Sequence, residues 1–149
     1  MSQPPPRYVL DTSALLTLIE DEAGADHVQA LLEQAKRGEV DLLISFISFM
    51  EVYYISLQER GQEEAHERVQ LMAALPVSRV ESTETLAVLA GQFKAVHRLS
   101  VADAWIAALA QERDATLVHK DPEFEQLEAT VKVLKLPYKR NMSFLKIRG

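Results

Sequence analysis

The sequence predicts an α/β fold in which a mostly parallel sheet is covered by helices on both faces. Short apolar runs alternate along the chain with longer segments of helical periodicity, the pattern expected of right-handed crossovers between parallel strands. The chain has 149 residues, 48% hydrophobic and 26% charged. This balance suits one globular domain and excludes a chain that is disordered throughout.

Strands and helices are expected to alternate from the first apolar run to the last. The expected strands are residues 8–10, 42–45, 77–80, 116–118 and 130–134. The expected helices are residues 13–20, 23–37, 49–60, 63–75, 84–96 and 102–113. Stop signals follow several of them, because Gly38 and Gly61 come after the second and third helices and Pro76 ends the fourth. Pro137 closes the last strand.

Charge is distributed unevenly along the chain, whose net charge is −6. Residues 1–128 hold all 22 acids with ten Lys and Arg, whereas residues 129–149 hold six Lys and Arg and no acid. We expect a disordered N-terminus at residues 1–6, a folded domain at residues 7–138 and a basic tail at residues 139–149. The acidic body argues against binding nucleic acid by charge alone, but it allows acids that hold a metal against a phosphate.

Cysteine is absent, which excludes disulfides, cysteine–zinc sites, iron–sulfur clusters and thiol nucleophiles. The most apolar stretch, residues 42–57, contains Ser45, Ser48 and Glu51 and is too short and too polar to span a membrane. No signal peptide is recognisable behind the prolines at positions 4–6. We therefore expect a cytoplasmic protein with no membrane partner.

Four acids are expected at the carboxyl edge of the sheet. Asp11 follows the first strand and Asp121 the fourth, although Asp11 would also serve as a helix N-cap and Asp121 as a turn before Pro122. Glu51 lies early in the helix at 49–60, where a capping box with Ser48 is the competing interpretation. Asp103 opens the helix at 102–113, where Ser100 provides a similar cap, but the acid continues an apolar stripe that faces inward.

These four acids are individually weak signals and jointly a strong one. Carboxylates that converge at one sheet edge repel each other unless a cation lies between them. Oxygen ligands without His or Cys favour Mg²⁺ or Mn²⁺. Such metals suit phosphoryl chemistry, so the pattern predicts a metal-dependent enzyme acting on a phosphate.

Three segments carry a resemblance to a known family. VLDTSAL at residues 9–15 resembles the opening motif of PIN domains, SVADAWIA at 100–107 is similar to their third acidic motif, and ATLVHKDPEF at 115–124 resembles their fourth. Glu51 falls where the family places its second acid. The resemblance covers residues 8 to about 138, and the subclass that it resembles best is the VapC-like toxin of toxin–antitoxin pairs.

The resemblance implies a three-layer α/β/α sandwich with a five-stranded parallel sheet. It also implies a Mg²⁺- or Mn²⁺-dependent endoribonuclease that hydrolyses RNA with metal-activated water, forms a homodimer and is inhibited by a small antitoxin. Asp11 and Asp103 would be the principal metal ligands, and Glu51 and Asp121 would complete the catalytic cluster. The supporting residues would be Thr12 and Ser13, which orient the first carboxylate or its water, and Ser100.

Two positions depart from the family pattern. His119 stands where the family often has a small hydroxyl residue, and Glu123 where it often has Asp. We expect His119 to be an ordinary surface residue, with substrate contact as the alternative. Two further basic groups are candidates for phosphate contact, although a solvated helix end and a solvated terminus explain them as well. They are Lys94, His97 and Arg98, and then Lys132, Lys135, Lys139, Arg140, Lys146 and Arg148.

Other functions compete with that of a toxin as interpretations of the sequence. A housekeeping PIN-domain nuclease would carry the same acids. A haloacid-dehalogenase-like phosphatase needs a second Asp where this chain has Ser13. A non-catalytic receiver-like signalling domain needs an acidic pair after the first strand, where Asp11 stands alone. A PIN fold kept only for binding is disfavoured because all four acids are present.

Overall fold

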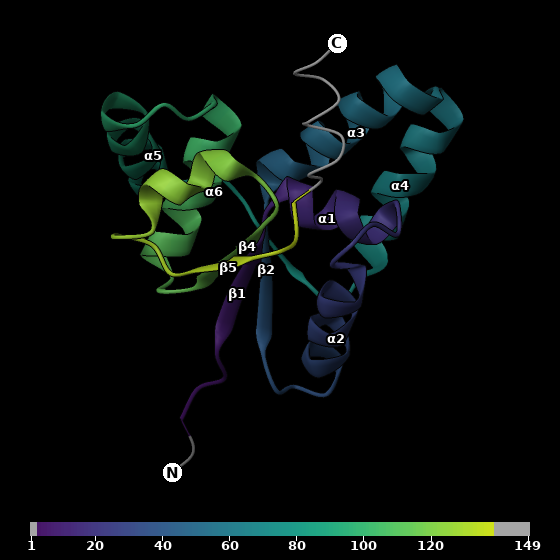
Figure 1. Cartoon of the computed structure of the whole chain (residues 1–149), viewed down its shortest axis with the longest axis horizontal. Helices are drawn as coiled ribbons and strands as arrows, with labels where there is room; N and C mark the ends of the chain where they lie inside the picture. Colours follow the sequence, from purple (N-terminus) through teal and green to yellow (C-terminus); the bar gives the residue numbers. More distant parts are fainter. Residues whose placement is uncertain (1–2, 139–149) are drawn as a thin grey trace.

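A computed structural model describes residues 3–138 as one α/β unit (Figure 1). The strands are β1 (Arg7–Leu10), β2 (Asp41–Ser45), β3 (Ser78–Val80), β4 (Thr116–His119) and β5 (Val133–Lys135). The helices are α1 (Thr12–Ile19), α2 (Ala25–Lys36), α3 (Phe46–Arg60), α4 (Gln62–Ala74), α5 (Glu84–Val96) and α6 (Val101–Glu112), with a 3₁₀ helix η1 (Pro122–Leu127). All strand pairs are parallel, as the sequence predicted, and the strand order is β3-β2-β1-β4-β5.

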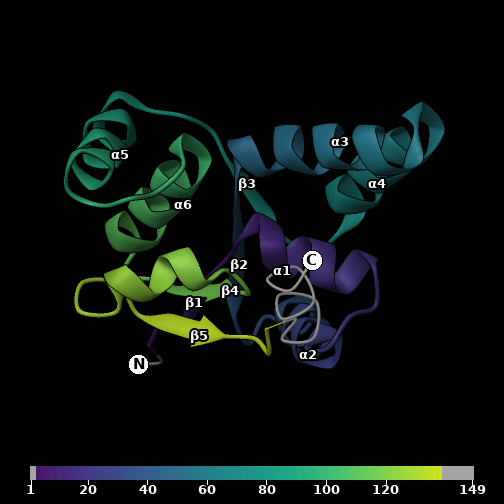
Figure 2. The same ribbon diagram turned by 45° about the horizontal axis from the view of Figure 1, so that its top comes forward.

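Two hydrophobic clusters fill the space between the sheet and its two helical layers. On one face Val9, Leu43 and Leu117 pack with residues of α5, α6 and η1. On the other face Leu10 and Val118 pack with residues of α1, α2, α3 and α4. Figure 2 shows the α3–α4 pair and the α5–α6 pair on different sides of the sheet, and the start of α3 meets α6 where the rings of Phe46 and Trp105 lie 5.2 Å apart between centroids. The central strands are buried on both faces. This explains why their sequences are continuous apolar runs and not alternations of apolar and polar residues.

The strand order separates this fold from a receiver domain. A receiver has the order 2-1-3-4-5, whereas here β1 lies between β2 and β4. Strands β2 and β3 therefore lie on one side of β1, and strands β4 and β5 lie on the other side. The point in the sheet where the strand order reverses is between β1 and β4. In open α/β sheets, ligands bind outside the carboxyl ends of the strands at such a switch point.

Two expected starts were wrong by three residues, and the other boundaries differ by two residues or fewer. The third helix begins at Phe46 and not at residue 49, because Ser45 accepts a hydrogen bond from Ile47 N and starts the helix directly after β2. The last strand is Val133–Lys135 and not residues 130–134. Thr130 N instead donates to Leu127 O and closes the turn after η1.

Several expectations fall partly outside the described part of the chain. Residues 1–2 and 139–149 are not described, so the whole of the predicted basic tail and the first two residues of the predicted disordered N-terminus lie outside the described part of the chain. Within residues 3–138, Pro6 O accepts a hydrogen bond from Asp41 N, next to the start of β1. No helix among the described residues is long and apolar enough to cross a membrane.

Candidate metal centre

The predicted acids lie at the carboxyl edge of the sheet, around the switch point between β1 and β4. Asp11 follows β1 directly, and its backbone N donates to Val118 O of β4 over 3.0 Å. Asp121 lies two residues after β4 and caps η1. Glu51 is on α3, and Asp103 is in the first turn of α6. Burial, and after it the charges of the neighbouring acids, raises the pKa of Asp11, Glu51 and Asp103.

Asp11 is a helix cap and a buried acid at the same time. Its Oδ2 accepts a hydrogen bond from Ser13 N over 2.9 Å and another from Ser13 Oγ, so the N-cap interpretation holds. Its Oδ1 is buried and has no hydrogen-bond partner among the described residues. Burial, with the charges of Glu51 and Asp121, raises the pKa of Asp11 from 3.8 to about 7.

Glu51 is held by Thr12 and not by a capping box. Thr12 Oγ1 donates to Glu51 Oε1 over 2.6 Å and also hydrogen-bonds Ser48 Oγ over 2.9 Å. The capping box between Ser48 and Glu51 was wrong, because α3 is capped by Ser45 and Ser48 is buried inside the helix. Burial raises the pKa of Glu51. Thr12 therefore orients Glu51, and Ser13 holds the carboxylate of Asp11.

Asp103 is positioned by the cap of its own helix. Ser100 Oγ accepts a hydrogen bond from Asp103 N over 3.1 Å, which starts α6 and fixes its first turn. The side chain is 7% exposed. Burial, together with the charges of Asp11 and Asp121 and hydrogen bonding with Glu123, raises the pKa of Asp103 to about 9. At neutral pH this carboxyl is protonated unless a cation is bound nearby.

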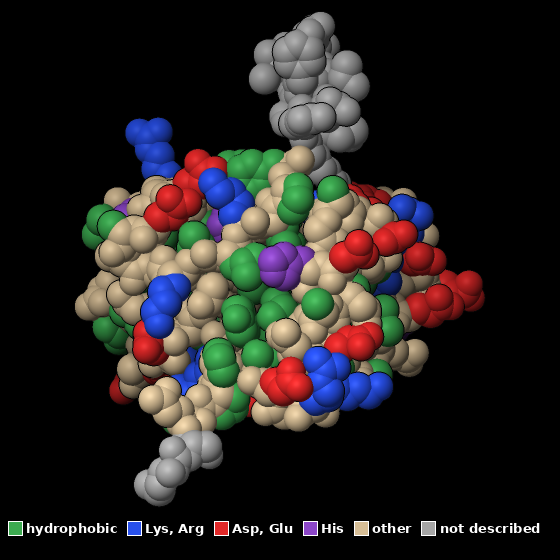
Figure 3. Space-filling model, turned by 60° about the horizontal axis from the view of Figure 1, so that its bottom comes forward, with side chains coloured by type: hydrophobic (Ala, Val, Ile, Leu, Met, Phe, Trp, Pro, Cys, Tyr) green, Lys and Arg blue, Asp and Glu red, His purple; other side chains and the backbone are tan. Residues whose placement is uncertain are grey.

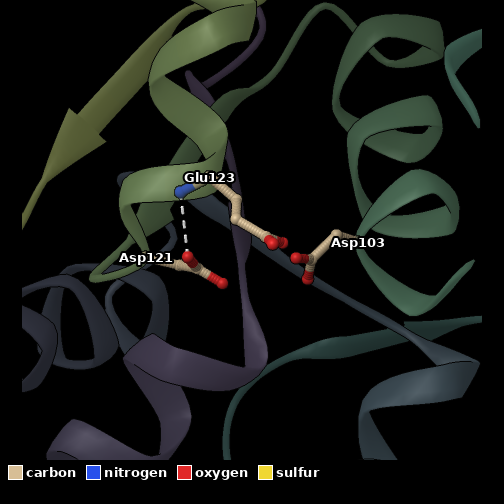
Figure 4. A group of neighbouring side chains, drawn as sticks. All are labelled: Asp103, Asp121 and Glu123. Carbon is tan, nitrogen blue, oxygen red and sulfur yellow. Dashed lines mark hydrogen bonds between the residues drawn. The ribbon is translucent and has the colours of Figure 1, made fainter. Parts of the chain in front are cut away.

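Glu123 joins the site although the sequence analysis did not include it. Single ligand oxygens of Asp103, Asp121 and Glu123 all lie within 4.8 Å of one another (Figure 4). Asp121 Oδ1 accepts a hydrogen bond from Glu123 N over 2.9 Å, so the start of η1 presents both carboxylates together. The signal was present in the sequence, because an acid two residues beyond Asp121 follows a proline that begins a turn.

The acids form two subsets. Asp103, Asp121 and Glu123 are the group that meets the spacing of a metal site. Asp11 and Glu51 are outside that group, yet both contribute to the raised pKa of Asp103. Of the two expected principal ligands, the structure places Asp103 within the compact group and Asp11 beside it.

His119 was expected at the surface, and this expectation was wrong. As the last residue of β4 it is 0% exposed, and its ring lies 5.2 Å from Phe124 and 6.5 Å from Tyr138 between ring centroids. Its Nδ1 is 3.1 Å from Asp121 N, which donates to it. Burial lowers the pKa of His119, so the imidazole is neutral.

A divalent cation fits this donor set. The ligands are carboxylate oxygens, which suit Mg²⁺ or Mn²⁺ and not a soft metal. The buried Oδ1 of Asp11 is without a partner among the described residues, and burial raises the pKa of Asp11, Glu51 and Asp103. These are the properties of acids that lack a counter-charge, which a bound cation would supply.

The face of the molecule in Figure 3 carries charges of both signs. On the face in Figure 3, Lys and Arg side chains are interspersed with Asp and Glu, and hydrophobic side chains lie between them. This face therefore carries no continuous cationic track for a phosphate backbone.

A family comparison matches the same region. The model of the PIN domain matches residues 8–129 of the chain. The chain belongs to the PIN domain family. Asp11, Glu51, Asp103, Asp121 and Glu123 all lie within the matched segment. Among curated protein sequences, none gives a significant match.

Solved PIN-type structures share this fold. VapBC2 from Rickettsia felis, bound to a DNA fragment from its promoter, has a TM-score of 0.72 at 17% identity, covering 88% of this chain and 99% of that chain. DNA-bound VapBC from Salmonella typhimurium has a TM-score of 0.69 at 20% identity, covering 87% and 98%. VapC20 from Mycobacterium tuberculosis, a toxin that cleaves the sarcin–ricin loop, has a TM-score of 0.67 at 16% identity, covering 87% and 99%.

Proposed function

We propose that this PIN domain is a Mg²⁺- or Mn²⁺-dependent endoribonuclease and the toxin of a type II toxin–antitoxin pair. One observation carries the nuclease part. Asp103, Asp121 and Glu123 gather within 4.8 Å at the switch point of a parallel sheet, and Asp11 beside them has a buried oxygen with no partner among the described residues. Without a bound cation, such an arrangement lowers the stability of the fold, since neighbouring carboxylates repel each other.

The chain's own residues have distinct roles in this proposal. Asp11, Asp103, Asp121 and Glu123 would hold the metal, and Glu51 would orient a water near it. When bound, a divalent ion would activate water and neutralise charge on the scissile phosphate. Thr12 fixes one oxygen of Glu51, and Ser13 fixes one oxygen of Asp11. The other oxygen of Asp11 would thereby face the ion.

The toxin part of the proposal rests on likeness and on an exposed surface. The similar structures include toxin–antitoxin complexes and a toxin that cleaves the sarcin–ricin loop. In this chain Met50, Tyr54 and Leu57 are exposed on α3 at helical spacing, with Leu71 exposed on the adjoining α4. An apolar stripe of this kind indicates a protein partner. An antitoxin is the proposed partner, and a second copy of the chain is the other expected contact.

Cleavage of RNA by the purified chain tests the nuclease. We expect mixed structured RNAs to be cut with Mg²⁺ or Mn²⁺ and left intact with chelator. Asp11→Asn and Asp103→Asn should each lower the rate by orders of magnitude. Asp26→Asn, an exposed acid on α2, is the matched control and should cut like wild type. Undiminished cleavage by either site variant would sink the assignment.

A housekeeping RNA-processing nuclease is the alternative that shares the same chemistry. The neighbouring reading frame separates the two functions, because a toxin is expected beside a short gene for a small DNA-binding protein. Co-expression of that product should relieve growth arrest caused by the chain and inhibit its cleavage of RNA in vitro. Arrest that persists when the two proteins are produced together would favour the housekeeping enzyme.

A further inference from the structure

His119 occupies a buried position that an apolar side chain would fill at lower cost. It ends β4 and packs against Phe124 of η1, and the ring of Tyr138, which follows β5 in the chain, also lies near it. Its Nε2 is buried and has no hydrogen-bond partner within residues 3–138. A buried polar atom without a partner costs about 1–3 kcal/mol. A favourable interaction at the other ring nitrogen, Nδ1, is therefore expected to offset this cost.

That role is visible at Nδ1. The backbone N–H of Asp121 donates to His119 Nδ1 over 3.1 Å, which fixes the neutral tautomer with its hydrogen on Nε2. The contact joins a side chain to the amide two residues further on. Asn and Asp make the same contact in Asx-turns, and Ser and Thr make it more weakly. His119 thus performs here the turn-forming role of a small polar residue.

The amide that His119 holds controls the compact acid group. The peptide before Asp121 sets the direction of that side chain, and Asp121 Oδ1 in turn accepts from Glu123 N. The preceding amide, Lys120 N, donates to Ser13 Oγ over 2.8 Å, and Ser13 also contacts Asp11. Two consecutive amides after β4 are therefore each held by a side chain, one by Ser13 and one by His119.

We propose that His119 is a positioning residue, which holds the β4–η1 turn so that Asp121 and Glu123 meet Asp103 at the metal centre. This inference rests on the proposed function only for its metal, since the turn itself is a property of the chain. Partners that orient metal ligands typically change metal affinity by 10–100-fold when removed. Packing alone would make no distinction between acceptor and non-acceptor side chains of suitable size.

Three substitutions separate positioning from packing. His119→Phe keeps an aromatic ring but removes the acceptor. His119→Asn loses the ring but keeps an acceptor at the position of Nδ1. His119→Gln keeps a polar amide but places its acceptor one bond further out. The readouts are Mn²⁺ affinity by titration calorimetry, hydrogen exchange at the Asp121 amide by NMR, and melting temperature, none of which requires an RNA substrate.

We expect His119→Phe to weaken Mn²⁺ binding about tenfold or more and to speed exchange at Asp121, without a matching loss of melting temperature. His119→Asn should recover affinity to within about threefold and restore slow exchange, whereas His119→Gln should resemble His119→Phe. Equal Mn²⁺ affinity and equal Asp121 exchange in wild type and His119→Phe would overturn the proposal. If His119→Phe does not fold, the comparison of His119→Asn with His119→Gln decides by the same two readouts.

Failure of this inference is distinguishable from failure of the proposed function. A wild-type chain that binds no Mn²⁺ would refute the metal centre, while Asp121 exchange in the variants would still test the turn. A wild-type chain that binds Mn²⁺ and cuts RNA, with His119→Phe unchanged in both binding and exchange, would refute the positioning role alone.

Discussion

At the scale of single residues, Asp11 combines two effects of opposite sign. Its Oδ2 caps α1 through Ser13, which stabilises the helix. Its Oδ1 is buried among other acids, which costs free energy whenever the carboxyl is ionised. An amide at this position would retain an oxygen for the cap, since Asn caps about as well as Asp, and would remove the buried charge.

We therefore predict that metal-free Asp11→Asn melts several degrees higher than metal-free wild type at pH 8, although it should be catalytically dead. A change of 1 kcal/mol shifts the melting temperature of a domain of this size by about 2–4 °C. Added Mg²⁺ should stabilise the wild type more than the variant, because only the wild type retains the full ligand set. Paired thermal melts that are level at pH 8, with no response to Mg²⁺, would show that Asp11 is only an N-cap.

The raised pKa values also predict how pH acts on the metal-free chain. Asp11 and Asp103 have folded-state pKa values of about 7 and 9, above the ordinary 3.8 of an unfolded Asp. At pH values between the ordinary pKa of 3.8 and these raised pKa values, the folded state binds more protons than the unfolded state. The free energy of unfolding therefore falls as pH rises. We expect the unfolding free energy in chelator to increase as pH is lowered from 9 towards 5, in urea titrations. A flat or rising profile with increasing pH would contradict the burial of these acids as protonated groups.

At the scale of elements, the first turn of α6 links helix stability to the site. Ser100 Oγ caps this helix through Asp103 N. We predict that Ser100→Ala lowers the unfolding free energy by about 1 kcal/mol and also weakens Mn²⁺ binding, because the turn that carries Asp103 frays. Ser100→Thr keeps a capping hydroxyl and should stay near wild type in both measurements. Calorimetric titration and thermal melts of the two variants, side by side, check this coupling.

The order and type of the elements followed from periodicity, and the failures lie where local signals competed. The helix start at Phe46 was missed because Phe46 and Ile47 are apolar like the residues of β2, with only Ser45 between the two runs. The last strand was placed too early, because Thr130 and Val131 are typical strand residues but close the turn after η1. Tertiary context outweighed propensity at both positions.

The gathering of these acids at one edge of the sheet could be predicted from topology, whereas the positions of Glu123 and His119 were not predicted. Asp11 and Asp121 follow strands, so the parallel sheet brought them to one edge before any side-chain geometry was known. Glu123 was left out because its direction depends on the 3₁₀ turn of η1. His119 was expected at the surface, but its burial could have been inferred. Residues two apart in a strand point to the same face, and Leu117 on that face is buried.

At the scale of the whole molecule, the chain separates an acidic site from a cationic end. Residues 129–149 carry six Lys and Arg and no acid, whereas carboxylates gather at the candidate metal centre. An RNA substrate would be repelled by the body and attracted by the end. The division predicts that affinity for RNA and the chemistry of cleavage can be altered independently.

Deletion of residues 140–149 tests that separation and removes Arg140, Lys146 and Arg148. For single strands the logarithm of affinity falls with the logarithm of salt by roughly 0.7 per phosphate neutralised, so three cations account for a slope of up to about 2. We expect the truncated chain to bind RNA more weakly by roughly tenfold at about 50 mM salt, with a flatter salt dependence, and to bind Mn²⁺ like the full chain. Fluorescence anisotropy with one labelled RNA, from about 50 to 200 mM salt, measures both effects. A matched variant with these three cations changed to Gln keeps the length and should behave like the deletion. Unchanged affinity and slope in both would assign the basic end no role in RNA binding.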